Sequence, residues 1–447
     1  MLRFVILLVA ACGAADPGLR KPTAPLPTGA GVHWSDTTFT GRGVTLYAQS
    51  WRPDGDVKAI VVIHHGLYDH GARYAAFAER LVHDGYAVWA MDMRGHGRSA
   101  GEQMRADRID DYLDDLDAFM RLVREREAGK PIYVFAHSLG GLIATLYTIE
   151  RQPPIAGLVL SGPGISFDAP PIQAATIRAI AAIAPGAPIL ALSRDAFSSS
   201  PTMPAQMAAD PLLYQRAGEA RTARAAIDGA SRVWAAPERL AVPLLVVAGS
   251  ADKLVAPSGG RDLVAHAGTK DASFILYDGF NHDLMHEPDA ARVMGDIQTW
   301  LDAHVDGHPA APPPLPTQRL TGDRGSSVTS IELDARGEQH DDLGVTAGLR
   351  ARFGFGPYVG GLDLRAGSFP DGRGALYEAD LHALGLGLHS HAGALVSITG
   401  GIGIGGLRGA SATHLPVELA LEAPLGPLRA LARAGAGWRL GGPRYAE

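Results

Sequence analysis

The eight residues from Val134 to Gly141 read VFAHSLGG and place Ser138 between two segments of different pattern. Before it, Ile132 to Ala136 (IYVFA) is a short apolar run of mostly β-branched or aromatic residues, which is typical of a buried strand. After it, the run from Gly140 to Tyr147 (GGLIATLY) can open a helix. The stretch therefore predicts a tight strand-to-helix turn with Ser138 at its apex. Whether this serine is a nucleophile depends on the partners that the rest of the chain supplies.

Similar apolar runs recur before residue 305 and alternate with helical segments. Between two of them, apolar residues recur at helical spacing from Ile109 to Val123, with acidic residues early and arginines late, which matches the helix dipole. Alternating strands and helices imply an α/β sandwich around a mostly parallel sheet. The further predicted strands are Ala59–His64, Tyr86–Met91, Leu158–Ser161, Leu244–Ala248 and Phe274–Tyr277.

The length of 447 residues favours two folded units, because one core rarely grows beyond about 250 to 300 residues. Apolar residues make up 46% of the chain, which is ample core material, and the formal net charge of −7 excludes nucleic acid as a partner. A Pro-rich linker over 306–326 separates a predicted α/β domain at 31–305 from a second domain at 327–447. Within the first, about 164–237 interrupts the alternation and is the predicted helical cap.

Beyond the linker, apolar residues alternate with small or polar ones, as they do from Val345 to Phe355. About seven such segments separated by turn residues predict a smaller all-β domain, either a meander or barrel-like. The alternation faintly resembles that of outer-membrane β-barrels, and a soluble periplasmic β-domain is the alternative. The sequence does not indicate what this domain does.

The single cysteine of the chain, Cys12, ends the N-terminal segment MLRFVILLVAAC (1–12), in which Arg3 precedes an apolar run. The segment is too short to span a bilayer, which takes about 20 apolar residues, but it suits a cleaved signal. Its end resembles the lipobox of bacterial lipoproteins, which implies lipidation of Cys12. Residues 13–30 are rich in Pro, Ala and Gly without periodicity, which predicts a tether. We therefore expect a membrane-anchored lipoprotein of the cell envelope, at the outer membrane or the periplasmic face. A plain secretory signal is the alternative.

Two further residues can supply what a serine nucleophile needs, namely a base that takes the hydroxyl proton and an acid that orients the base. Asp252 follows one predicted strand in LLVVAGSADKLVAP, and His282 follows the next in FILYDGFNHDLMHEPD. Each of the three residues comes just after the carboxyl end of a predicted strand, where α/β sheets place their sites. The sequence thus predicts that Ser138, His282 and Asp252 share one catalytic site.

Five motifs extend this pattern in sequence order: HHGLYDHGARY (64–74), MDMRGHGRSAG (91–101), FAHSLGG (135–141), GSADKLVAP (249–257) and GFNHDLMHEP (279–288). Together they resemble the monoacylglycerol lipase and lysophospholipase branch of the α/β-hydrolases over about residues 33–305. The resemblance implies an α/β-hydrolase fold with a helical cap. It also implies a serine ester hydrolase that cleaves monoacylglycerols or lysophospholipids through an acyl-enzyme, without a metal or other cofactor. The oxyanion hole is then formed by the backbone N–H groups of Leu67 and Leu139.

The resemblance leaves alternatives open. Ala136 stands where the Gly-x-Ser-x-Gly turn of serine hydrolases has its first glycine, and we expect its extra methyl group to cause only a small packing adjustment. The same branch has also been described as serine aminopeptidase-like, so a peptidase or amidase is one alternative. A non-catalytic envelope lipoprotein that uses the fold as a scaffold is another, although the intact Ser-Asp-His order argues against it.

Several polar residues in these motifs have both a structural and a chemical interpretation. Asp283 and His286 are rivals of the predicted acid and base, but their positions directly after His282 and toward the final helix disfavour them. A loop-shaping role is favoured over catalysis or metal binding for the following residues: Asp92, Arg94, His96, Arg98, His64, His65 and His70.

The apolar residues of the predicted cap either line an acyl-chain tunnel or pack the cap onto the body. Both roles can hold together. The candidates are Ile172, Ile177, Ile180, Ile183, Ile189, Leu190, Leu192, Phe197, Met203 and Met207.

Overall fold

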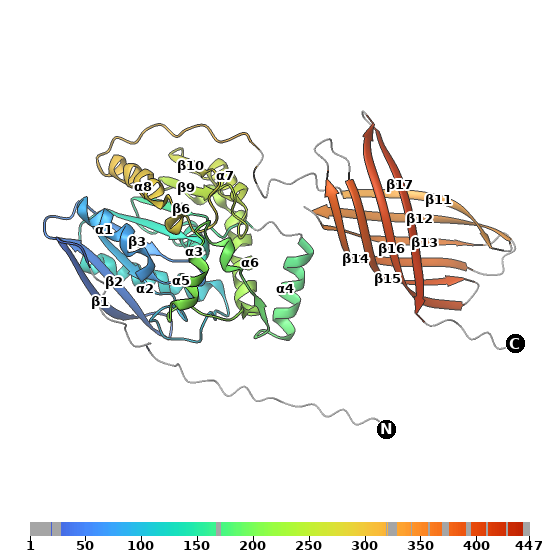
Figure 1. Cartoon of the computed structure of the whole chain (residues 1–447), viewed down its shortest axis with the longest axis horizontal. Helices are drawn as coiled ribbons and strands as arrows, with labels where there is room; N and C mark the ends of the chain where they lie inside the picture. The colour runs from blue at the N-terminus through green and yellow to red at the C-terminus, as the bar shows by residue number, and fades with distance from the viewer. Residues whose placement is uncertain are drawn as a thin grey trace, which may run out of the picture. The chain divides into compact units, whose positions relative to one another are not determined.

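The structure of the protein is a computed structural model (Figure 1), which describes residues 19, 28–166, 171–318 and 320 and the backbone of the strands between 329 and 440. Apart from residues 169–172, the chain divides at residue 323 into two compact units. Cys12 and most of the predicted tether lie outside the described residues. Lipidation of the chain therefore stays a prediction.

The larger unit is built on an eight-stranded sheet with the strand order β1-β2-β4-β3-β5-β6-β9-β10. β1 and β2 form an antiparallel hairpin, β2 pairs antiparallel with β4, and the other neighbours pair in parallel. The six predicted strands are confirmed with ends that differ by at most two residues, whereas the hairpin was missed because its first strand is rich in polar residues. The strands are β1 (Val32–Thr40), β2 (Thr45–Pro53), β3 (Ala59–His64), β4 (Tyr86–Met91), β5 (Ile132–His137), β6 (Gly157–Ser161), β9 (Leu244–Gly249) and β10 (Ala272–Tyr277).

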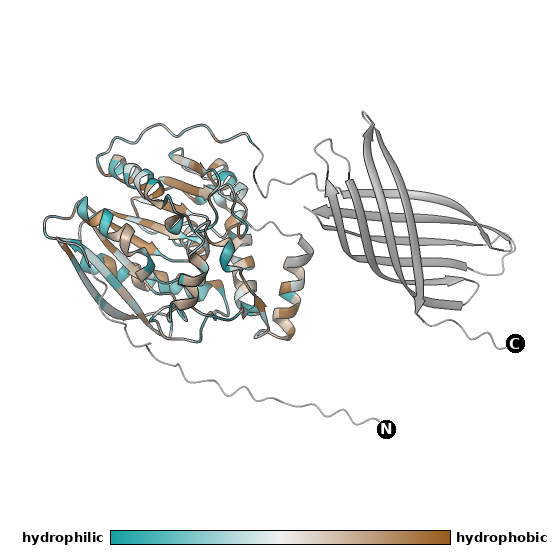
Figure 2. Cartoon of the chain, in the orientation of Figure 1, coloured by the Kyte–Doolittle hydropathy of each residue, from teal (hydrophilic) through white to brown (hydrophobic). Residues whose placement is uncertain are grey.

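Helices cover both faces of this sheet, because its central strands are apolar on both faces (Figure 2). Along β3, Ile60 and Val62 belong to one buried cluster while Val61 and Ile63 belong to the other. The first cluster packs against α2 (Ile109–Arg126), α3 (Ser138–Arg151) and α7 (Pro257–His266), and the second packs against α1 (Ala75–His83) and α8 (Ala290–Val305). This arrangement is the predicted α/β sandwich.

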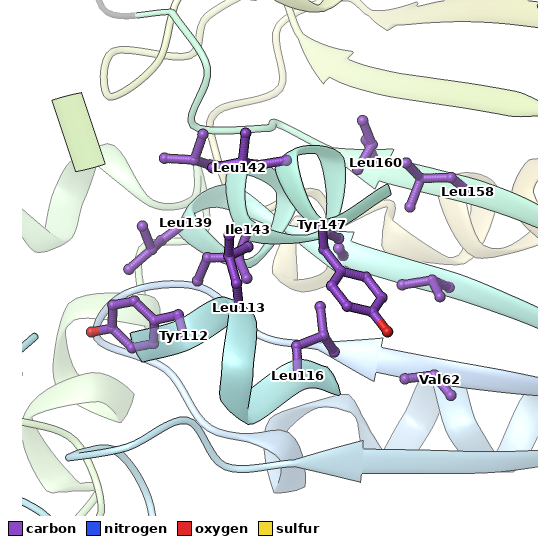
Figure 3. Packing of buried hydrophobic residues seen from close by; sticks show 14 of the residues in the cluster. Val62, Tyr112, Leu113, Leu116, Leu139, Leu142, Ile143, Tyr147, Leu158 and Leu160 are labelled. Atoms are coloured by element: carbon purple, nitrogen blue, oxygen red, sulfur yellow. The ribbon is translucent and has the colours of Figure 1, made fainter. Parts of the chain in front are cut away.

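Helix α3, which follows the serine turn, is the most enclosed of these helices. Figure 3 shows Ile143 and Tyr147 on the side of α3 that faces α2 and Leu142 on the opposite side, and all three side chains are at most 2% exposed. Because a fully buried Leu or Ile side chain contributes about 1.5 to 3 kcal/mol, this packing fixes the position of the first turn of α3. The residue at the start of α3 is thereby held at one place above the sheet.

Within its described residues, the segment between β6 and β9, where the cap was predicted, contains three α-helices, two short 3-10 helices and a two-stranded sheet. Among the described residues of the chain, none of the helices has the length and hydrophobicity that a bilayer span requires. The elements of this cap are α4 (Pro171–Ile183), β7 (Pro188–Leu190), α5 (Met203–Ala209), β8 (Gly218–Glu219) and α6 (Ala220–Ala235).

The smaller unit is a seven-stranded sheet in sequence order, in which each strand pairs antiparallel with the next. Register shifts interrupt the pairing of β14 with β13 and with β15. The choice between a meander and a barrel-like domain stays a prediction. The strands are β11 (Thr329–His340), β12 (Asp342–Phe355), β13 (Tyr358–Ser368), β14 (Ala375–His389), β15 (Leu395–Leu407), β16 (Ala410–Leu425) and β17 (Leu428–Leu440).

Candidate active site

Ser138 is the first residue of α3 and directly follows β5. Its φ of +52° lies in the left-handed region, which costs on the order of 1 to 3 kcal/mol for a residue with a side chain. Close packing holds this strained turn in place: a Cβ on Gly140 would lie 2.3 Å from the carbonyl oxygen of His65, so glycine is needed there. The turn raises the partly exposed Ser138 at the carboxyl edge of the sheet.

Ala136, the departure from the glycine pattern, is fully buried in β5. It pairs with His64 of β3 on one side and with Leu160 of β6 on the other. Its methyl group belongs to the first apolar cluster, so it has apolar neighbours and leaves the turn after it intact.

The structure brings Ser138, His282 and Asp252 into one hydrogen-bonded row. The Nε2 atom of His282 lies 2.8 Å from the Ser138 Oγ atom, and its Nδ1 atom lies 2.7 Å from Oδ2 of Asp252. The other carboxylate oxygen of Asp252 accepts the backbone N–H groups of Leu254 at 2.8 Å and Val255 at 3.0 Å. Both oxygens of the carboxylate are therefore occupied, which fixes its orientation toward the imidazole.

Burial and charge act in opposite directions on His282, which is only 1% exposed. Burial disfavours the imidazolium and lowers its pKa, whereas the charge and hydrogen bond of Asp252 and the more distant charge of Asp283 raise it. The net effect is a pKa above the ordinary value of 6.5. An imidazole in this position accepts a proton more readily than a free histidine does.

The loop after β3 lies against the serine turn. A Cβ on Gly66 would lie 2.9 Å from Cβ of Ser138, so the backbone of this loop touches the serine directly. The next residue is Leu67, whose N–H group donates to no backbone carbonyl within the described part of the chain. The N–H of Leu139 belongs to the first turn of α3, where N–H groups have no acceptor in the helix. The assignment of these two N–H groups to the oxyanion hole stays a prediction.

Asp283 and His286 form a separate pair instead of joining the row. Nδ1 of His286 lies 2.8 Å from Oδ1 of Asp283, and Nη2 of Arg73 lies 3.3 Å from the other oxygen. Burial disfavours the Asp283 carboxylate, but the charges and hydrogen bond of its neighbours prevail and hold its pKa well below the usual range. Asp283 and His286 therefore support the loop that carries His282 without contacting Ser138.

The polar residues of the 64–70 and 92–98 motifs make loop contacts. Asp92 accepts the N–H groups of Gly71 and Arg98, and Arg94 pairs with the buried Asp115. His65 contacts the carbonyl oxygen of Gly66 and accepts the N–H of Met93, His64 is fully buried, and His96 contacts the carbonyl oxygen of Arg94. Within the residues that the structure describes, no His, Cys, Asp or Glu cluster is arranged to hold a metal ion.

A cavity of about 450 Å³ opens in the cap. Of the apolar candidates from the sequence, Leu192, Phe197 and Met207 line it, whereas Ile183 is 87% exposed and therefore neither lines it nor packs the cap. The Phe197 ring lies edge-on to His282 with centroids 6.1 Å apart. The other lining residues are Tyr68, Ala191, Arg194, Asp195, Pro204, Leu213, Tyr214, Gln215, Arg216 and Ala217.

Glu287, which the sequence analysis did not single out, joins the cap to the loop of His282. One oxygen of its buried carboxylate accepts the N–H of Asn281 at 2.7 Å and lies 3.0 Å from the N–H of Ser199 in the cap. The other oxygen accepts the Ser199 hydroxyl. The position of Glu287 in the 279–288 motif could have marked it as a candidate site residue. Its hydrogen bonds to Ser199 in the cap, however, could not be predicted from the sequence.

The strand order and the serine turn after β5 define the α/β-hydrolase fold. A family model described as serine aminopeptidase, S33 matches residues 55–289. The chain belongs to this family.

Known relatives agree with this assignment. The monoacylglycerol lipase of Mycolicibacterium smegmatis is 31% identical over 274 residues, which cover 61% of this chain and 98% of that protein. The monoglyceride lipase of Homo sapiens is 29% identical over 279 residues, which cover 61% of this chain and 91% of that protein. The crystal structure of the Paleococcus ferrophilus monoacylglycerol lipase matches with a TM-score of 0.53 and 27% identity, covering 58% of this chain and 99% of that chain. This chain is accordingly a carboxylic ester hydrolase.

Proposed function

We propose that the chain hydrolyses monoacylglycerols or lysophospholipids, with Ser138 as nucleophile, His282 as base and Asp252 as the orienting acid. The observation that carries this proposal is the row of contacts from Ser138 Oγ to His282 Nε2 at 2.8 Å and from His282 Nδ1 to Asp252 Oδ2 at 2.7 Å. Because a serine hydroxyl is a poor nucleophile without a positioned base, a row of this kind is what ester cleavage through serine requires.

In the first half of the reaction, Ser138 Oγ attacks the ester carbonyl carbon while His282 Nε2 takes the hydroxyl proton. The Asp252 carboxylate stabilises the imidazolium, and the N–H groups of Leu67 and Leu139 donate to the oxyanion; losing one such donor typically costs about 10²- to 10³-fold in rate. The tetrahedral intermediate then collapses, His282 gives its proton to the departing alcohol oxygen, and an acyl-enzyme remains. Water resolves the acyl-enzyme by the same proton transfers.

The cavity in the cap supports a lipid substrate. Its volume of about 450 Å³ is in the range of small-molecule sites. Leu192, Phe197 and Met207 form the apolar part of a lining that also contains charged side chains, among them Arg194 and Asp195. Phe197 also contacts the ring of His282, so this apolar part of the cavity borders the catalytic base. The similarity to monoacylglycerol lipases agrees with such a substrate.

We also propose that the chain is a lipoprotein of the cell envelope, anchored through lipidated Cys12. The support is the sequence pattern before Cys12. A Cys12→Ser variant is expected to lose both membrane association and incorporation of labelled lipid. If both persist, the anchor is excluded.

Active-site labelling tests the catalytic proposal. A fluorophosphonate probe is expected to label the wild-type chain and not Ser138→Ala, and the same variant is expected to lose hydrolysis of monoacylglycerols. An unlabelled wild type, or a labelled Ser138→Ala, would overturn the assignment of the nucleophile. The substrate assignment is tested on the same preparation with monoacylglycerols, lysophospholipids and aminoacyl amides. Turnover of the amides alone would replace the lipase proposal by a peptidase or amidase.

A further inference from the structure

Tyr68 has a backbone conformation that residues with side chains rarely adopt. Its φ is +55°, in the left-handed region where Cβ crowds the following carbonyl oxygen. Such strain persists only where the surrounding structure holds it, and it concentrates at functional sites. The position of Tyr68 directly after Leu67 makes it a candidate for such a role.

The hydroxyl group of Tyr68 makes hydrogen-bond contacts with three backbone groups of the cap, which can stabilise this strained backbone. It lies 2.7 Å from the carbonyl oxygen of Leu190 and 2.8 Å from that of Arg216, and its single proton is donated to one or shared between them. It also accepts the N–H of Gly218 at 3.1 Å. Leu190 ends β7 and Gly218 begins β8, so the hydroxyl lies where the two cap strands pair. Burial raises the pKa of Tyr68, which keeps the hydroxyl protonated and able to donate.

The ring of Tyr68 extends the same connection. It stacks on Tyr214 with centroids 6.5 Å apart and lines the cavity in the cap. It also packs against the cap cluster that contains Phe197 and Met207. A chain that occupies the cavity therefore touches the residue next to the proposed oxyanion donor.

On the other side of Leu67, the loop is fixed by contact with the nucleophile. A Cβ on Gly66 would lie 2.9 Å from Cβ of Ser138 and 3.0 Å from Cδ2 of His137, so the backbone of Gly66 lies close against the serine turn. The direction of the Leu67 N–H group is then set by Gly66 on one side and by the backbone of Tyr68 on the other. A relaxation of Tyr68 to negative φ would rotate the peptide planes beside Leu67.

We propose that Tyr68 is a positioning residue for ester hydrolysis: the cap holds its hydroxyl, the hydroxyl holds its left-handed backbone, and that backbone keeps the Leu67 N–H directed at the oxyanion. The proposal rests on the proposed function, because it presupposes Ser138 as nucleophile and Leu67 as donor. It adds that the cap takes part in forming the oxyanion hole and does more than enclose the substrate.

Two substitutions separate this role from simple packing. Tyr68→Phe keeps the ring and the backbone strain but loses the hydroxyl hydrogen bonds to the cap. On a short soluble ester, p-nitrophenyl butyrate, kcat is therefore expected to fall about tenfold, which is part of the loss seen when one oxyanion donor is removed. Tyr68→Gly removes the ring but also the strain, because glycine adopts positive φ freely, so kcat on this ester is expected to return to within about threefold of wild type. For a long-chain monoacylglycerol, KM is expected to rise in Tyr68→Gly and to change little in Tyr68→Phe, since only the glycine variant loses a cavity wall.

The relative kcat values of the two variants distinguish a positioning role from a packing role, because a packing role predicts a lower kcat for the larger truncation, Tyr68→Gly. The proposal is overturned if Tyr68→Phe keeps kcat within twofold of wild type, or if Tyr68→Gly is slower than Tyr68→Phe. Tyr86→Phe is the matched control, because it removes a hydroxyl hydrogen bond of 2.7 Å to Asp302 at the amino end of β4, away from the site, and is expected to leave kcat unchanged. Full activity of Ser138→Ala would instead refute the proposed function, so the two failures are distinguishable.

Discussion

Replacing Gly66 by alanine tests how tightly the loop after β3 is bound to the nucleophile. The new Cβ would lie 2.9 Å from Cβ of Ser138 and 3.0 Å from Cδ2 of His137. Because carbon atoms in contact prefer at least about 3.5 Å, one side must move by roughly 0.6 Å. The serine turn cannot yield easily, since the first turn of α3 already touches the backbone of the same loop at Gly140. The displacement therefore falls on Gly66 and Leu67.

A displacement of this size has a large catalytic effect, because a misplacement of about 1 Å can cost about 10²-fold in rate. We expect kcat of Gly66→Ala on p-nitrophenyl butyrate to fall by about 10²-fold, which corresponds to about 2.7 kcal/mol in the activation free energy. KM is expected to change much less, since the displaced donor acts on the oxyanion and not on the cavity.

The matched control for this experiment is Gly55→Ala. A Cβ at Gly55 meets no atom within 4 Å, and neither this residue nor Gly66 has a positive φ, so both substitutions avoid backbone strain. The control is expected to keep wild-type kcat and thermal stability. A Gly66→Ala variant that folds and keeps kcat within twofold of wild type would refute the argument that this loop forms part of the oxyanion hole.

Two further predictions follow from the site. His282 must be neutral to accept the serine proton, and its pKa lies above the ordinary value of 6.5, so kcat/KM is expected to fall as the pH drops through a midpoint above 6.5. Asp252→Asn should shift that midpoint down, because it removes the charge that raises the pKa of His282. A wild-type midpoint below 6.5 would contradict this explanation of the His282 pKa. Glu287→Gln should lower the free energy of unfolding in urea by about 1.5 to 3 kcal/mol, because a charged acceptor shared by Asn281 and Ser199 is replaced by a neutral one; unchanged stability would mean that this link between the cap and the His282 loop is weak.

The three residues of the row were recognisable in the sequence for a simple reason. Each follows a strand of a parallel sheet, and the carboxyl ends of such strands meet at one edge, so Ser138, Asp252 and His282 had to be close in space. The same reasoning separated Asp283 from the row, because a residue directly after the base points elsewhere, and the structure gives it His286 and Arg73 as partners.

Residues whose roles depend on the cap could not be predicted in this way. Tyr68 contacts Leu190, Arg216 and Gly218, and Glu287 contacts Ser199, across separations that no local pattern records. The apolar pattern of the cap was equally ambiguous, since it assigned a buried role to Ile183, which is 87% exposed.

Local strand and turn patterns were enough to predict an α/β sandwich, six parallel strands and the order of the candidate catalytic residues, because parallel strands share one edge of the sheet. The α/β-hydrolase fold followed from the resemblance of the five motifs to that family. The three-dimensional structure was needed to show which polar residues hydrogen-bond with the candidate catalytic residues, which cap residues line the cavity and how the cap contacts the loop after β3. Those choices depend on side chains from distant segments meeting at hydrogen-bond distance, and the free energy of such contacts exists only once the chain has folded.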